Sequence, residues 1–261
     1  MDPASELHEV LVAPRRAFVT LPDTRVIDRP DWMQLLTPSL RDGGMNEVCL
    51  AVLAEDEADA AIDATIADYR QHGIRFRWTV GPDSAPADLI ARLQARGMVA
   101  QTVIGMACGG EILRSLPTIH GDRDGVVSVE RVEDDAVVTT YSEVMATGWG
   151  MAVAPVLAFN RHVLAAAPER SQLYLARVDG RPAGVGALAL LPRSAYLIGA
   201  VVLPEFRGRG VYRALIGARA RDTLAGGRTL LTCQARAQTS APILLGLGFH
   251  EVCRMESLAF S

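Results

Sequence analysis

The segment from residue 195 to residue 227 constrains the fold more than any other part of the sequence. A nearly all-apolar run at 195–203 predicts a strand, and the pattern at 211–225 predicts a helix that ends at Gly226 and Gly227. Between them stands a short turn, Pro204-Glu205-Phe206-Arg207-Gly208-Arg209-Gly210. A strand that turns this tightly into a helix is typical of layered folds in which helices cover a sheet.

Strand-like and helix-like patterns alternate along the rest of the chain as well. Before residue 117 they predict strands at 47–53 and 75–80 and helices at 56–72 and 88–96. After residue 126 they predict a helix at 152–166 and strands at 173–178, 183–190 and 229–233. A polar stretch rich in turn-forming residues, 117–125, separates the two regions. We therefore predict two α+β (layered α/β) domains, residues 1–120 and 127–261.

A short motif occurs once in each region. Ser84-Ala85-Pro86 leads through a short helical pattern to Gly97 and a strand-like run, and Ser240-Ala241-Pro242 leads in the same way to Gly248. The recurrence has two explanations: chance in an alanine-rich chain, or an internal repeat. Because the pattern that follows the motif also agrees, we interpret the regions as two similar domains.

Composition narrows the class of partner. The 261 residues carry a net charge of −4, and no block of like charge interrupts them. The charge balance disfavours a nucleic acid or an anionic membrane surface as partner, so we expect a small molecule or a peptide. All 26 basic residues are arginines, which excludes any lysine chemistry.

The cysteines and histidines show no spacing typical of a metal site, so no metal cofactor is expected. Each of the four cysteines lies in or beside an apolar run and is interpreted as a reduced core residue. The first residues lack a basic stretch followed by an apolar one, and no apolar run is long enough to span a bilayer. These observations predict a cytoplasmic protein; a homodimer is compatible with the sequence, which leaves the oligomeric state open.

The turn before the helix carries the chemistry. Glycine at 208 and 210 lets the backbone adopt dihedrals that other residues avoid and lets a bulky anion approach closely. Unpaired amides and the dipole at the N-terminus of the helix favour that anion, and Arg207, Arg209 and Arg213 add positive charge. We therefore predict a pyrophosphate site.

Other phosphate loops fit the turn less well. A Walker loop needs a lysine, and the dinucleotide fingerprint would place its third glycine where Arg213 stands. Two further alternatives are a helix N-terminus that carries glycine and arginine without a ligand and a contact to RNA. The apolar strand and the strict order of strand, glycine turn and helix favour the pyrophosphate.

Residues 206–211, Phe-Arg-Gly-Arg-Gly-Val, resemble the acyl-CoA signature of the GNAT superfamily of N-acyltransferases, [Gln/Arg]-x-x-Gly-x-[Gly/Ala]. The resemblance covers about residues 127–261 and includes Leu247-Gly248-Phe249 near the end. It implies tandem GNAT-like domains, each a mixed, mostly antiparallel sheet flanked by helices, with a splayed strand before the turn in the second. The first region resembles the C-terminal part of the same fold but lacks the turn, which implies a degenerate copy.

The resemblance also implies a binding mode for acetyl-CoA, which serves as the acyl donor. It assigns the pantetheine arm to the backbone of Val201, Val202 and Leu203. It assigns the pyrophosphate to the turn and the start of the helix, at residues Arg207, Gly208, Arg209, Gly210, Val211, Tyr212 and Arg213.

Two positions depart from the family pattern. Tyr212 replaces the last glycine or alanine of the signature, and Leu244 stands where many members carry the tyrosine that protonates the CoA thiolate. Ser240 and Thr239, one turn earlier, have two readings: contacts to the CoA arm or residues that cap a helix.

Four residues of the second domain are candidates for catalysis or for binding the acceptor. Tyr196, on the strand that leads into the turn, is the candidate catalytic residue and would act as a relay through water. The alternative is a packed strand aromatic with no catalytic role. Tyr141, Glu143 and Trp149 are candidate acceptor-binding residues; each is also explained by ordinary packing or solvation.

The predicted function is an acyl-CoA-dependent N-acyltransferase that transfers acetyl to an amine of a small molecule or a peptide by direct attack. The alternative is a non-catalytic acyl-CoA-binding sensor or partner protein, which Leu244 and the lack of an evident base favour.

Overall fold

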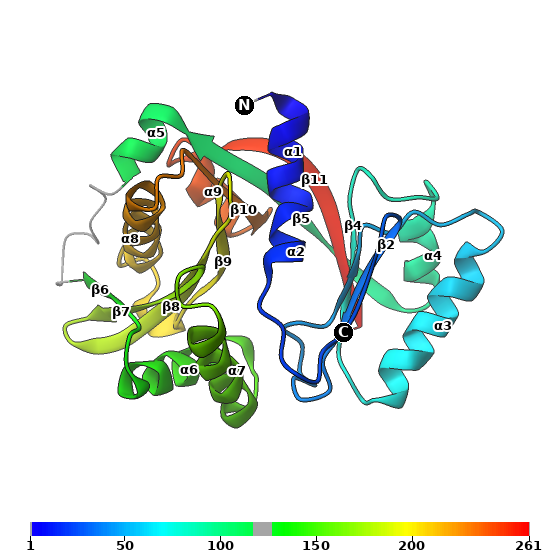
Figure 1. Ribbon diagram of the computed structural model, residues 1–261, viewed down its shortest axis with the longest axis horizontal. Helices are drawn as coiled ribbons and strands as arrows, with labels where there is room; N and C mark the ends of the chain where they lie inside the picture. The colour runs from blue at the N-terminus through cyan, green and yellow to red at the C-terminus, as the bar shows by residue number, and fades with distance from the viewer. Residues whose placement is uncertain (1, 117–126, 261) are drawn as a thin grey trace. The chain divides into compact units, whose positions relative to one another are not determined.

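The computed structural model describes residues 2–116 and 127–260 (Figure 1). The polar stretch predicted as the domain boundary, 117–125, lies outside these residues. The chain divides into two compact units, and neither is one continuous segment. The larger unit comprises Met1–Val19, Met106–Gln234 and Pro242–His250, and the smaller unit comprises Thr20–Gly105, Ala235–Ala241 and Glu251–Ser261.

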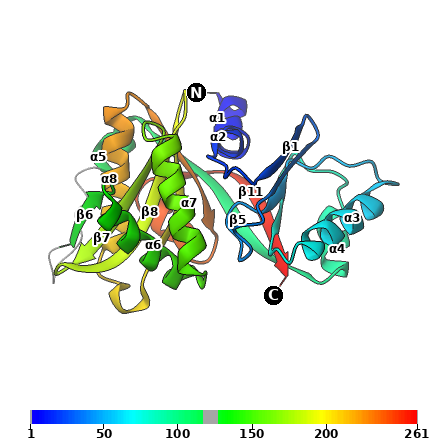
Figure 2. The same cartoon turned by 60° about the horizontal axis from the view of Figure 1, so that its bottom comes forward.

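The smaller unit is a sheet with two helices packed against it. Its strands are β1 (Arg25–Arg29), β2 (Trp32–Leu36), β3 (Glu47–Cys49), β4 (Arg77–Val80), β11 (His250–Phe260) and the first part of β5 (Met98–Gly109), in the order β1-β2-β3-β4-β11-β5. Strands β3 and β4 are parallel, whereas β1 with β2, β2 with β3 and β4 with β11 are antiparallel. Helices α3 (Ala58–Gln71) and α4 (Leu89–Ala95) lie side by side (Figures 1 and 2).

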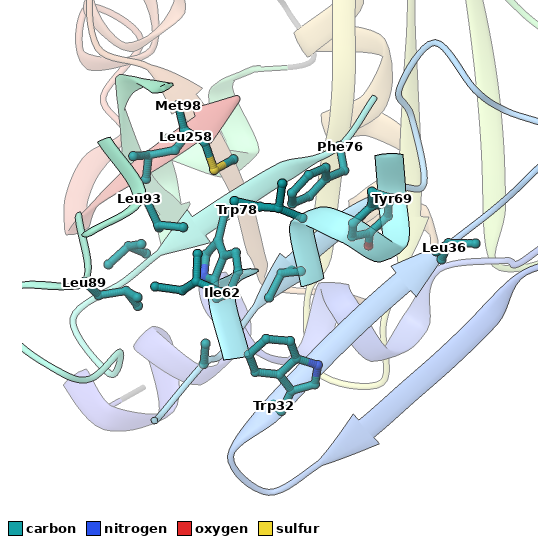
Figure 3. Packing of buried hydrophobic residues seen from close by; sticks show 14 of the residues in the cluster. Trp32, Leu36, Ile62, Tyr69, Phe76, Trp78, Leu89, Leu93, Met98 and Leu258 are labelled. Atoms are coloured by element: carbon teal, nitrogen blue, oxygen red, sulfur yellow. The ribbon is translucent and has the colours of Figure 1, made fainter. Parts of the chain in front are cut away.

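Aromatic side chains form the core of the smaller unit (Figure 3). The Trp32 and Trp78 rings meet edge to face, with centroids 5.3 Å apart, and Tyr69 stacks on Phe76 at 3.9 Å. The Tyr69 hydroxyl donates to the Leu35 carbonyl at 2.5 Å, and burial raises its pKa. Leucines from α4 and isoleucines from α3 fill the space between these rings and the helices.

The larger unit is built on a second set of strands. In order across the sheet they are the last part of β5, then β10 (Leu230–Arg236), β9 (Ala195–Val202), β8 (Arg181–Leu190), β7 (Ser171–Val178) and β6 (Val127–Arg131). Strands β9 and β10 are parallel, and the pairs from β9 to β6 are antiparallel. The helices are α1 (Pro3–Leu11), α2 (Ala13–Ala17), α5 (Gly110–Ser115), α6 (Asp135–Trp149), α7 (Val153–Ala166), α8 (Val211–Ala225) and α9 (Ser240–Leu245), whose first two residues belong to the smaller unit.

Alternation along β8 assigns its two faces to different helices. Val185 and Ala187 pack with the apolar residues of α6 and α7. A Cβ atom at Gly184 or Gly186 would instead meet the side chain of Val211 or of Arg219, both on α8. Because successive side chains of a strand point to opposite faces, α6 and α8 cover opposite faces of this sheet.

The predicted α+β class, with mostly antiparallel sheets, is confirmed. Helix α8 has the predicted bounds, and the helices predicted at 56–72, 88–96 and 152–166 are α3, α4 and α7, with ends within two residues. The strand predicted at 47–53 ends earlier, at Cys49, because Leu50 adopts a left-handed φ of 53°. The first Ser-Ala-Pro copy precedes helix α4 and strand β5, whereas the second copy forms the first three residues of α9, which leads to β11.

The compact units differ from the predicted ranges 1–120 and 127–261. The last strand, β11, pairs with β4 from Glu256 opposite Val80 to Ala259 opposite Arg77, so residues 251–261 complete the smaller unit. Residues 1–19 belong to the larger unit, where the buried Glu9 accepts a hydrogen bond from Ser194 at 2.5 Å. Pairing over long sequence distances, which a linear pattern does not carry, explains the difference.

Across residues 2–116 and 127–260, no helix is both long and apolar enough to cross a membrane.

The packing of α4 gives a prediction for stability. Leu89 is 0% exposed, so Leu89→Ala should lower the free energy of unfolding by about 2–5 kcal/mol, because it leaves a cavity among aromatic rings. Urea denaturation measures the change. Val99→Ala is the control, since Val99 is 58% exposed and should change stability by less than about 0.5 kcal/mol. Equal effects of the two substitutions would contradict this packing.

Candidate functional site

The turn between β9 and α8 leaves the start of a helix uncapped. Gly208 and Gly210 have φ values of 78° and 77°, in the left-handed region that disfavours other residues. Gly210 is the N-cap of α8 and offers no side chain to accept from the first-turn amides. These amides have no acceptor within the helix, so the turn is suited to an anion.

Backbone hydrogen bonds and a buried aromatic ring hold the turn in place. The Leu203 amide donates to the Ala183 carbonyl at 2.9 Å, and the Phe206 amide donates to the Leu203 carbonyl at 3.0 Å. The Phe206 ring is buried, and the Arg181 guanidinium lies 5.1 Å from its centroid. A Cβ atom at Gly184 would lie 2.8 Å from the Val201 carbonyl oxygen, so glycine is needed for this close approach.

The three arginines that were predicted to favour the pyrophosphate lie in different surroundings. The Nε of Arg207 donates to the Val202 carbonyl at 3.3 Å. Arg209 forms an ion pair of 3.1 Å with Asp179, in the turn between β7 and β8. Arg213 is exposed on the first turn of α8 and forms no ion pair with the part of the chain that the structure describes. All three arginines belong to the turn or to the first turn of α8, where positive charge favours an anion, and Asp179 offsets part of the charge of Arg209.

Strand β9 has one paired edge and one open edge. It pairs with β8 along residues 195–202, but with β10 only through Ala195, Tyr196 and Leu197. Because the Leu203 amide and carbonyl are used by Ala183 and Phe206, alternation directs the backbone of Val202 to the open edge. The open edge therefore runs toward the glycine turn.

A β-bulge and a tryptophan lie where the two strands separate. Ala187 pairs with Ile198 and Gly186 with Ala200, so Gly199 is the extra residue of the bulge. A Cβ atom at Gly199 would lie 2.8 Å from the indole of Trp149, the last residue of α6, which is 37% exposed. The structure thus places Trp149 directly on the bulge.

The other predicted acceptor residues do not meet at the bulge. Tyr141 is buried in the core between α6 and the sheet, and this burial raises the pKa of its phenol. Glu143 lies on the exposed face of α6. Tyr196 is 5% exposed and packs edge to face against Phe18, with ring centroids 6.4 Å apart.

The positions near α9 provide no evident acid. Leu244 is 1% exposed, and its carbonyl accepts from the amide of Phe249 at 3.0 Å. The Ser240 hydroxyl accepts from the Arg236 amide at 2.9 Å, which closes the turn before α9. Ser240 belongs to the smaller unit, so its assignment to the CoA arm stays a prediction.

Other reactive groups are buried or dispersed. All four cysteines are free and buried, and burial raises the pKa of Cys233 to about 12 and that of Cys253 to about 11, so these thiols stay protonated near neutral pH. Among the described residues, no group of three or more His, Cys, Asp or Glu side chains is arranged to hold a metal ion.

Sequence reasoning missed the glycines that shape the site. Gly184, Gly186 and Gly199 lie inside strands, where an isolated glycine often marks a bulge or a close approach. That signal was present in the sequence. Arg219, which lies beneath the bulge, gave none, because its helix has arginines on several sides.

Comparison with known proteins extends this description. Residues 118–232 match the acetyltransferase (GNAT) domain family. The curated proteins contain no match to the chain.

Solved structures share the fold at low sequence identity. A GCN5-related N-acetyltransferase from Kribbella flavida is 17% identical, with a TM-score of 0.65 over 96% of each chain. One from Sphaerobacter thermophilus is 14% identical, with a TM-score of 0.62 over 99% of this chain and 93% of that one. A tandem GNAT protein from the clavulanic acid biosynthesis pathway is 14% identical, with a TM-score of 0.59 over 98% and 94%. The predicted tandem GNAT-like fold is thereby confirmed.

The contact between Trp149 and the bulge gives a prediction. Gly199→Ala should displace the indole and destabilise the fold by about 1–3 kcal/mol, because its new methyl group overlaps the ring. Trp32 and Trp78 are buried, so quenching of tryptophan fluorescence by acrylamide reports mainly Trp149 and should increase. Gly246→Ala, whose Cβ makes only ordinary contacts at 3.5 Å, is the control. Unchanged quenching in folded Gly199→Ala would contradict the placement.

Proposed function

We propose that this chain is a GNAT acetyltransferase, as the match of residues 118–232 to that domain family supports, and that it transfers an acetyl group from acetyl-CoA to the amine of a small molecule or a peptide. The observation that carries the proposal is the continuity between the open edge of β9 and the uncapped N-terminus of α8. One element offers an extended backbone, and the next offers amides for an anion. CoA has an amide-containing arm and a pyrophosphate in that order.

Each part of the donor has a proposed partner. The amides from Gly208 to Arg213 hold the pyrophosphate, with Arg207 and Arg209 adding positive charge. The backbone at Val201, Val202 and Leu203 takes the pantetheine arm, mainly through the Val202 amide at the open edge, since the Val202 carbonyl already accepts from the Arg207 Nε at 3.3 Å. This path directs the thioester to the bulge, where the Trp149 indole covers Gly199 and borders the space for the acceptor.

The reaction needs positioning and a route for one proton. The amine nitrogen attacks the thioester carbonyl, the carbon–sulfur bond breaks, and the proton lost by nitrogen ends on the CoA sulfur. Leu244 supplies no acid, so this proton reaches the sulfur from the ammonium or through solvent. Tyr196 is the phenol we propose as a water-linked relay; its packing against Phe18 fixes the ring.

Substitution at the turn tests donor binding. Gly210→Val should weaken acetyl-CoA binding by about 100-fold, because a strained turn and a branched side chain remove charge-assisted hydrogen bonds to phosphate. Isothermal titration measures the affinity and, for the wild-type chain, should give one site per chain. A second saturable site would contradict the assignment of residues 1–120 as a copy without a CoA loop.

A second glycine provides a matched control for backbone strain. Gly227 has a φ of 74°, close to the 77° of Gly210, but lies at the other end of α8. Gly227→Val should cost similar stability and leave acetyl-CoA affinity unchanged. Equal affinities of folded Gly210→Val and the wild type would remove the main support for this site.

Turnover separates the enzyme from the alternative, a non-catalytic acyl-CoA-binding sensor or partner. The buried Leu244 is the observation that favours that alternative. Release of free CoA from acetyl-CoA with a panel of amines supports transfer. Tight binding of acetyl-CoA without turnover across the panel would favour the sensor.

Tyr196→Phe tests the relay while it conserves the ring. We expect turnover to fall by about tenfold, less than the ~10²–10⁴-fold of direct proton transfer, because a water-linked relay is more easily replaced. Initial rates at saturating acetyl-CoA measure the effect, and the acetyl-CoA affinity should not change. A rate equal to that of the wild type would assign Tyr196 to packing against Phe18 alone.

A further inference from the structure

A buried arginine lies beneath the bulge of β9. Arg219, on α8, is 1% exposed, and its Nε donates to the Leu215 carbonyl of its own helix at 2.9 Å. Its Nη1 donates to the carbonyls of Ala187 at 3.2 Å and Ile198 at 3.5 Å. One guanidinium therefore joins α8, β8 and β9.

The two strand carbonyls mark the place where the ladder becomes irregular. Ala187 and Ile198 pair with each other across β8 and β9, and the next pair, Gly186 with Ala200, skips Gly199. A bulge disrupts the regular exchange of hydrogen bonds between strands. The guanidinium supplies a donor to these carbonyls from outside the ladder.

The sequence leaves room for this contact. A Cβ atom at Gly186 would lie 3.0 Å from both Cζ and Nη1 of Arg219, closer than side chains normally approach. Glycine at 186 is thus matched to arginine at 219. The pair consists of a residue without a side chain and one whose head group occupies the space above it.

The charge of Arg219 is costly where it lies. In the described part of the chain it forms no ion pair with a carboxylate, and burial lowers the pKa of its guanidinium. The phenols of Tyr212, Tyr174 and Tyr141 and the thiol of Cys233 oppose that shift. An apolar side chain of similar volume would fill the same space at less cost, so its hydrogen bonds at the bulge distinguish the arginine.

We propose that Arg219 is a positioning residue that fixes the bulge of β9 relative to α8. The inference rests on the proposed function, because α8 begins at the pyrophosphate turn and β9 provides the open edge for the pantetheine arm. Arg219 is not proposed to contact the pyrophosphate or the pantetheine arm itself. It sets the alignment of α8 and β9, the two elements that hold them.

The test compares two ligands. The first is acetyl-CoA, and the second is 3′-phospho-ADP, the nucleotide part of CoA, which lacks the pantetheine arm. Arg219→Met should weaken acetyl-CoA binding by about tenfold, the equivalent of one or two hydrogen bonds, and leave 3′-phospho-ADP binding unchanged. Arg219→Lys, which keeps a donor but not the three-way contact, should lie between Arg219→Met and the wild type. Arg221→Met, exposed on the same helix, is the control and should bind both ligands like the wild type.

Gly186→Ala serves as a second variant if Arg219→Met does not fold. It keeps the charge but displaces the guanidinium, and should show the same selective loss of acetyl-CoA affinity. Hydrogen exchange of the ligand-free proteins adds a readout that does not depend on donor binding. In both variants, peptides covering residues 196–203 should exchange faster than in the wild type, while those from α7 should not change.

The outcomes separate the two proposals. Wild-type affinity and exchange in Arg219→Met would overturn the role of Arg219. Equal loss of affinity for both ligands, together with a lower unfolding midpoint, would also overturn it, because that pattern is general destabilisation. A wild-type chain that binds neither ligand would overturn the proposed function instead, and faster exchange at the bulge would then still support Arg219 as its anchor.

Discussion

The incomplete pairing of β9 is the constraint on which the candidate site depends. Seven of the eight residues of this strand pair with β8, but only three pair with β10, so the backbone beyond Leu197 has an open edge. Backbone groups that lack a partner are costly when they are buried away from water. An extended ligand that pairs with the edge removes this cost, and the glycine turn at its end directs the ligand to the N-terminus of α8. In the proposed donor complex, the arm ends near the bulge at Gly199, where the Trp149 indole lies.

The features predicted from the sequence are those encoded by local patterns. The strand at 195–203, the glycine turn and the helix at 211–225 lie within one continuous stretch, and each has its own signal in apolar periodicity or in glycine. Trp149 lies on the bulge, and its predicted role in binding the acceptor stays a prediction. Glu143 and Tyr141 were proposed as polar residues on the expected cleft side of the second domain. Helical phase decided their positions: Glu143 faces solvent and Tyr141 faces the core.

The features that sequence reasoning missed depend on contacts between distant segments. Strand β11 ends the chain, yet it pairs with β4, and its own pattern does not identify this partner. Residues 1–19 join the larger unit through buried polar contacts such as Arg15 with Gln234 at 2.7 Å, which no apolar periodicity reveals. Arg219 is the clearest case. A charged residue in a helix predicts a solvated face. The glycine that leaves room for Arg219 is Gly186, which lies on a separate element, strand β8.

The buried Leu244 bears on how much catalysis this geometry can provide. A fixed acid increases the rate by about 10²–10⁴-fold. Holding two reactants in attack geometry lowers the barrier by about 7–11 kcal/mol, which is the larger effect on the rate. In thioester aminolysis the thiolate is a good leaving group because its conjugate acid, a thiol, has a pKa of only about 8.5, so it departs without prior protonation and the position of the amine relative to the carbonyl carries more of the barrier. In the proposed donor site, the open edge of β9, the bulge and the indole above it would set this position. If the chain acts as proposed, leucine at 244 should therefore reduce activity less than a side chain at 199.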